Sequence, residues 1–66
     1  MKTVSELKTP KHLVTWMIVE VDGEVKHWVS NLRIEDGCEI LNTHTDDYQH
    51  AQDAFVQCVR RVTEDL

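Results

Sequence analysis

The sequence predicts an α+β fold: a three-stranded antiparallel β-meander followed by one C-terminal α-helix, in the order β-β-β-α. Two Asp-Gly dipeptides separate three stretches rich in β-branched and aromatic residues. The C-terminal third instead carries apolar residues at spacings of three and four, which is typical of an amphipathic helix. We therefore expect a single domain over residues 12–66, preceded by an N-terminal tail or short helical turn over residues 1–11.

The N-terminal segment is compatible with two structures. Thr3 and Glu6 have the spacing of a capping box for one helical turn, which Pro10 would end. A loose tail fits the same residues equally well.

Three strands are predicted over residues 13–21, 24–34 and 38–43. The first turn, Asp22-Gly23, is the strongest short hairpin signal, because a type I′ turn needs positive φ at both central positions. Asp36-Gly37 repeats the signal between the second and third strands. If both are two-residue turns, Trp16 lies opposite Val29 and Arg33 opposite Ile40.

The helix is expected to begin after Asp46, with Gln49 completing a capping box. Arg60 and Arg61 lie near its C-terminal end, where cations are favoured. Its apolar stripe comprises Tyr48, Ala51, Phe55, Cys58, Val59, Val62 and Leu66.

Alternation of side chains sorts the predicted sheet into two faces. The more apolar face, to which we assign the helix, comprises Leu13, Thr15, Met17, Val19, Val21, Lys26, Trp28, Ser30, Leu32, Ile34, Leu41 and Thr43. The opposite face would then be an exposed patch large enough to bind a partner, either a second copy or a target protein. Its predicted interface residues are Trp16, Ile18, His27, Val29, Arg33, Ile40 and His44. Alternatively, the N-terminal segment folds over this patch.

Charge is unevenly distributed along the chain, whose net charge is −5. Residues 1–11 are net basic, whereas the central part forms a predicted acidic surface of Glu20, Asp22, Glu24, Glu35, Asp36, Glu39, Asp46, Asp47 and Asp53. Such a surface repels phosphate backbones, which disfavours direct nucleic-acid binding and favours a basic protein partner. The alternative is a solvated face that only keeps the protein soluble.

Catalytic and metal chemistry find little support in the sequence. Cys38 and Cys58 lack any metal-binding spacing and are interpreted as small buried hydrophobic residues. His27 and His44 would be neighbours on one face, but a structural zinc site needs four ligands. We expect no enzyme activity, no metal and no cofactor. With neither a signal peptide nor a membrane span, we expect a cytoplasmic protein with no membrane partner.

Residues 17–62 resemble the YegP-like small domain family. The resemblance is carried by Glu-Val-Lys-His-Trp-Val at residues 24–29, by Asp36-Gly37 where the family often has Asn-Gly, by Glu-Ile-Leu-Asn-Thr at residues 39–43 and by Asp-Tyr at residues 47–48. It implies a three-stranded meander with one helix, and dimers or tandem copies, but no agreed biochemical activity. Val29 departs from the basic residue that commonly follows the strand-two Trp.

The sequence thus predicts a small acidic, non-enzymatic protein-interaction module or inhibitor. Phage and mobile-element proteins that block host nucleic-acid machinery, such as anti-CRISPR proteins, are of this kind, and an acidic surface would occupy a basic groove of the target. One alternative is a YegP-like homodimer with a housekeeping role. Another is a weak single-strand nucleic-acid binder that stacks bases on Trp16 or Trp28.

Overall fold

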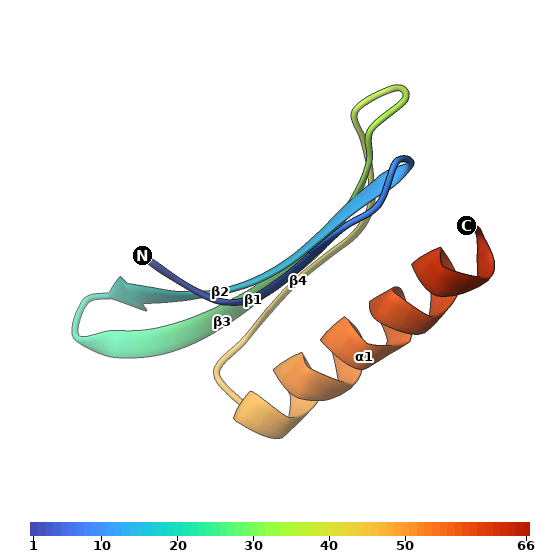
Figure 1. Ribbon diagram of the computed structural model, residues 1–66. Helices are drawn as coiled ribbons and strands as arrows, with labels where there is room; N and C mark the ends of the chain where they lie inside the picture. The colour runs from blue at the N-terminus through green and yellow to red at the C-terminus, as the bar shows by residue number, and fades with distance from the viewer.

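The computed structural model describes residues 1–66 and contains one antiparallel sheet with a helix on one face (Figure 1). The sheet order is β1-β2-β3-β4. The elements are β1 (Lys2–Lys8), β2 (His12–Val21), β3 (Glu24–Arg33), β4 (Cys38–Thr45) and α1 (Tyr48–Glu64). The α+β class and the single C-terminal helix are confirmed. The prediction of three strands is wrong, because the sheet has four.

The additional strand is β1, in the segment predicted to be a tail or a helical turn. It pairs antiparallel with β2, and Leu7, opposite Val14, packs against the core. A tight turn joins the two strands, in which the Thr9 hydroxyl accepts hydrogen bonds from the backbone N–H groups of Lys11 and His12. Pro10 therefore lies in a β-turn rather than at the end of a helix.

The β2–β3 hairpin has the predicted register, with Trp16 opposite Val29 and Met17 opposite Trp28. Asp22 and Gly23 both have positive φ, at 52° and 79°. This confirms the two-residue turn, whose twist matches that of the flanking strands.

The β3–β4 connection differs from the predicted two-residue turn. It is a four-residue loop over residues 34–37, in which the Gly37 N–H donates to the Arg33 carbonyl oxygen at 2.9 Å and Gly37 has φ 69°. The Arg33 guanidinium also donates to both carboxylate oxygens of Asp36, at 3.0 and 2.6 Å. As a result Arg33 pairs with Cys38, not with Ile40.

An irregularity of the β3–β4 register next to Ile40 then shifts the rest of β4. Beyond it, Asn31 pairs with Leu41 and Val29 with Thr43. Since a shift of one residue reverses the faces of a strand, Leu41 lies on the opposite face from the one predicted.

The helix is capped by Asp47, not by the predicted Asp46. The Asp47 carboxylate accepts a hydrogen bond from the Gln49 backbone N–H at 3.0 Å. Of the predicted stripe, Ala51, Cys58 and Val62 are buried. Phe55 packs partly buried beside them, whereas Tyr48 and Leu66 remain largely exposed.

The core lies between α1 and the sheet face that carries Trp16, so the predicted assignment of the helix to the other face is wrong. Two clusters form this core: Val14 with Cys58 and Val62, and Trp16 with Val29 and Ala51. Leu41, moved by the register shift, packs against both clusters. By contrast Val21 and Ile34, which made the other face more apolar in sequence, lie exposed at strand ends.

Candidate interaction surface

The sheet has one face without a helix, which we call the open face. Side-chain alternation and the strand register define its residues. From β2 these are Leu13, Thr15, Met17, Val19 and Val21; from β3, Lys26, Trp28, Ser30 and Leu32; from β4, Glu39, Asn42 and His44. β1 contributes Glu6 and Lys8 at the edge, opposite Thr15 and Leu13.

Trp28 lies on the open face and is held by its neighbours on β4. Its indole N–H donates to the Asn42 side-chain oxygen at 2.7 Å, and the Asn42 amide in turn donates to the Glu39 carboxylate. The His44 ring meets the indole edge-on, with the ring centroids 4.9 Å apart. The indole is therefore oriented before any partner arrives, so little side-chain entropy remains to be lost on binding.

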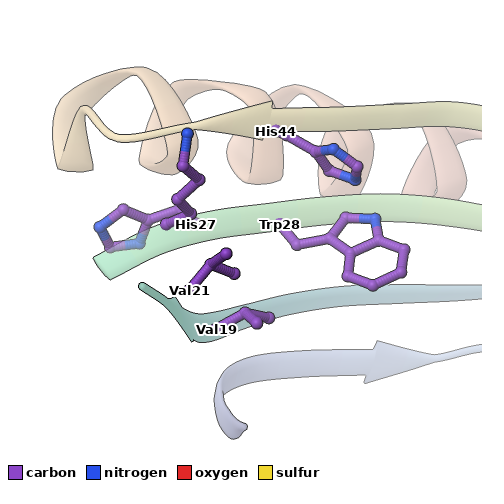
Figure 2. A pocket seen from close by; sticks show the side chains of 6 residues that line it. Val19, Val21, His27, Trp28 and His44 are labelled. Carbon is purple, nitrogen blue, oxygen red and sulfur yellow. The ribbon is translucent and has the colours of Figure 1, made fainter. Parts of the chain in front are cut away.

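A shallow pocket adjoins Trp28 toward the tip of the β2–β3 hairpin. Its lining residues are Val19, Val21, Lys26, His27, Trp28 and His44. Figure 2 shows Trp28 and His44 on adjacent strands, with Val19 and Val21 on the next strand and the helix behind the sheet. The pocket is thus lined by the rings of Trp28 and His44 and by the aliphatic side chains of Val19 and Val21, which suits an apolar side chain of a partner.

Three residues of the predicted interface are instead buried under the helix. Trp16 is 4%, Val29 0% and His27 7% exposed. None of them is accessible to a partner, because α1 covers the face on which they lie. Ile18 and Arg33 are half-buried, whereas Ile40 and His44 are exposed.

Trp16 and His27 of the covered face form an aromatic cluster with Tyr48 and Phe55 of α1. The Trp16 ring lies 5.3 Å from Tyr48, 5.9 Å from Phe55 and 5.9 Å from His27, measured between ring centroids. Its indole N–H donates to Nδ1 of His27 at 3.1 Å, which satisfies both buried groups. Trp16 is thus a core residue.

The two histidines that were predicted to be neighbours lie on opposite faces. His27 pairs with Thr45, and His44 pairs with Trp28, because of the register shift in β4. They cannot share an ion. No three His, Cys, Asp or Glu side chains lie close enough to hold a metal.

The acidic residues predicted to form one surface are divided between the two ends of the sheet. One end, where β2 meets β3 and β4 meets α1, is called the acidic end and holds Glu20, Asp22, Glu24, Asp46, Asp47 and Asp53 against Lys2 and Lys26. The other end holds Glu35, Asp36 and Glu39 together with five of the seven basic residues. β3 separates the two ends by about 30 Å. The negative field is therefore concentrated at the acidic end.

At the opposite end, a hydrogen bond from His12 and an ion pair with Lys11 attach the end of the helix to the β1–β2 turn. His12 Nε2 lies 3.0 Å from an Asp65 carboxylate oxygen, and Lys11 Nζ lies 3.8 Å from the other. The hydrogen bond from His12 and the charge of Lys11 lower the pKa of Asp65. At the neighbouring β3–β4 loop, the hydrogen bond from Arg33 lowers the pKa of Asp36 to about 2.

The two thiols differ in exposure. Cys58 is buried in the core as predicted, and burial raises the pKa of its thiol. Cys38 is exposed at the start of β4, so the prediction that it is buried is wrong.

No protein-family model, curated protein or solved structure matches the chain. The resemblance to the YegP-like family stays a prediction. None of the helices is both long and apolar enough to cross a bilayer.

Sequence reasoning overlooked Trp28 as the centre of the open face. The signal was present, because in the confirmed β2–β3 register Trp28 lies opposite Met17, and both are on the face that does not carry Trp16. Which of the two faces the helix covers depended on β4, whose register the sequence did not reveal.

Proposed function

We propose that this protein is a non-enzymatic interaction module that binds a protein partner through its open face, centred on Trp28. The observation that carries the proposal is the pre-oriented indole on a helix-free sheet face, beside the apolar side chains of Met17 and Val19. Trp is the residue most enriched at the energetic centres of protein interfaces.

The surroundings of Trp28 have the composition of an interface. Met17, opposite Trp28, is half-buried, and Leu13 is a further half-buried apolar residue of β2 on the same face, while Lys8 and Glu6 supply charge at the β1 edge. An apolar centre with a polar rim is the usual anatomy of a protein–protein interface.

The chemistry of the thiols supports a non-enzymatic role. A nucleophilic cysteine needs an accessible thiol with a lowered pKa. Cys58 is buried and its pKa is raised, while exposed Cys38 donates only to a neighbouring carbonyl oxygen. We therefore propose binding rather than covalent catalysis.

The acidic end favours a second contact, with a basic surface. Six acids against two lysines at one end of a small molecule produce a directional negative field, which speeds the encounter with a basic partner. If the protein is an inhibitor of nucleic-acid machinery, the anti-CRISPR type included, its target would present such a basic groove. Replacing Glu20, Asp22 and Glu24 by the neutral amides should slow association and reduce its salt dependence, while Trp28→Glu should mainly speed dissociation.

Site-specific photo-crosslinking in the native cell tests the proposal. A benzophenone side chain is introduced at Ser30 on the open face and, as the matched control, at Val56 on the exposed side of the helix. We expect a discrete protein adduct from position 30 only, and its loss in the Trp28→Glu background. Equal labelling from both positions, or none from position 30, would contradict the proposal.

A further inference from the structure

The open face has an internal symmetry that points to its occupant. Three of the five β2 residues on this face lie opposite a β3 residue of similar character: Leu13 with Leu32, Thr15 with Ser30, and Met17 with Trp28. The other two, Val19 and Val21 toward the hairpin tip, lie opposite Lys26 and Glu24. In a two-fold contact residue i touches residue j of the partner subunit and residue j touches residue i, so a contact that sets these three rows on themselves brings apolar side chains against apolar ones and hydroxyl groups against hydroxyl groups.

We propose that a second copy of this chain occupies the open face, packed face to face about a two-fold axis that runs along the strands between β2 and β3. This rests on the proposed function, whose binding face it uses. The rotation sets β2 of one subunit on β3 of the other. A row of directly opposite residues, such as Leu13 and Leu32, then packs on the same row of the partner subunit. Leu13 then meets Leu32 of the partner subunit, and Met17 meets Trp28 of the partner subunit, each contact occurring twice.

Charges at the sheet edges select this axis. Lys8 on β1 and Glu39 on β4 lie at opposite edges of the same row, which runs through Leu13 and Leu32. The rotation sets the β1 edge over the partner's β4 edge, so Lys8 faces Glu39 of the partner subunit at both edges. An axis across the strands would instead superpose the two β4 edges and bring Glu39 toward the partner's Asp46, a like charge.

The sheet edges themselves offer a poorer route to self-association. β1 has an irregular register at Val4, and β4 has one next to Ile40. Such bulges disrupt the edge ladder and hinder the addition of a further strand. The face, rather than either edge, is therefore the surface for a second copy.

The size of the face determines how tight the dimer is. Four strands about 4.8 Å apart, over the seven residues from Leu13 to Val19 at about 3.4 Å each, span roughly 450 Å² in projection. A standard interface buries about 800 Å² per partner, so we expect a reversible dimer. The axis also brings the two acidic ends to the same side, where the repulsion between their like charges further limits the affinity.

Sedimentation equilibrium of charge-swapped variants tests the geometry. Lys8→Glu and Glu39→Lys should each raise the dimer Kd about tenfold, because two attractive pairs become repulsive. The double variant should return the Kd to within about threefold of the wild type. Arg60→Glu is the charge-reversal control, since Arg60 is exposed on α1, away from both the open face and the acidic end, and should leave the Kd unchanged. Thermal unfolding establishes that each variant is folded.

The outcomes separate this inference from the proposed function. A wild type that stays monomeric at millimolar concentration overturns the dimer, as does a double variant that fails to recover. If the chain is monomeric and position 30 still crosslinks to a different protein, the proposed function stands and only the dimer is lost. If the chain is monomeric and position 30 crosslinks to nothing, both are overturned.

Discussion

The two faces of this sheet each carry one tryptophan, and the two residues have different roles. Trp16 is 4% exposed, beneath the helix, with its N–H bonded to His27. Trp28 is half-buried on the open face, with its N–H bonded to Asn42. The comparison of Trp16 with Trp28 shows that the position of the helix, and not residue type or apolar content, determines which face of the sheet becomes the core.

The largest expected difference between the faces is in stability. Trp16→Ala removes a side chain packed against Val29, Ala51 and Phe55, and should lower the free energy of unfolding by about 3–5 kcal/mol. Trp28→Ala should cost about 1 kcal/mol, since its face is open to water. Urea denaturation at low protein concentration measures both. Equal costs would show that the two faces are equally buried.

The acceptors of the two indole N–H groups provide a finer test. His27→Phe leaves the Trp16 N–H unpaired in the core and should cost about 1–3 kcal/mol. Asn42→Ala leaves the Trp28 N–H free to bond water and should cost no more than about 0.5 kcal/mol. The same denaturation experiment measures the difference, and a larger cost for Asn42→Ala would reverse the assignment of core and surface.

The helix covers its face from a start set by Asp47. Asp47→Ala should cost about 1 kcal/mol, because the Gln49 N–H loses its acceptor. Asp46→Ala is the matched control and should change stability by less than about 0.5 kcal/mol. Thermal unfolding followed by circular dichroism distinguishes them. If Asp46→Ala has the larger effect, the cap is at Asp46.

The smallest expected effect is a pH dependence of the free energy of unfolding. It arises at the end of the sheet where Asp65 connects the helix to the β1–β2 turn. The folded pKa of Asp65 lies below its ordinary value of 3.8, and that of Asp36 is about 2. Each carboxylate therefore stabilises the fold fully above about pH 4, and the contribution is lost as the pH falls through the folded pKa.

Unfolding of Asp65→Asn and Asp36→Asn from pH 6 to pH 2 tests this dependence. Each variant should be less stable than the wild type at pH 6 and converge with it at low pH. Glu24→Gln, at the hairpin tip, is the control and should run parallel to the wild type. A gap that stays constant across the range would mean that the lost interaction does not depend on ionisation.

Sequence patterns predicted the local features of this fold well. The Asp22-Gly23 turn and the register of β2 with β3 follow from two positive φ angles, which are a property of those two residues. The apolar stripe of the helix follows from its own periodicity. Cys58 was correctly expected in the core for the same reason.

The predictions are wrong where contacts with residues outside the local segment determine the structure. Residues 2–8 become a strand because β2 offers an unpaired edge, which no local pattern reveals. Asp36-Gly37 repeats the earlier turn signal, but the Arg33 guanidinium donates two hydrogen bonds to the Asp36 carboxylate and a longer loop forms. That loop and the bulge near Ile40 place Leu41 on the covered face. Because the prediction had Leu41 on the other face, it assigned the helix to that face and the interface to the face that the helix covers.

The sequence alone determined the two alternating faces of β2 and β3, the helix that follows them and the net charge of −5, because each depends on the order of neighbouring residues. Only the tertiary structure decided which face became the core and which stayed open. That choice depended on a one-residue shift of β4, and in a strand with a two-residue repeat such a shift exchanges inside and outside. Trp16 and Trp28 exchanged their expected roles through that single step.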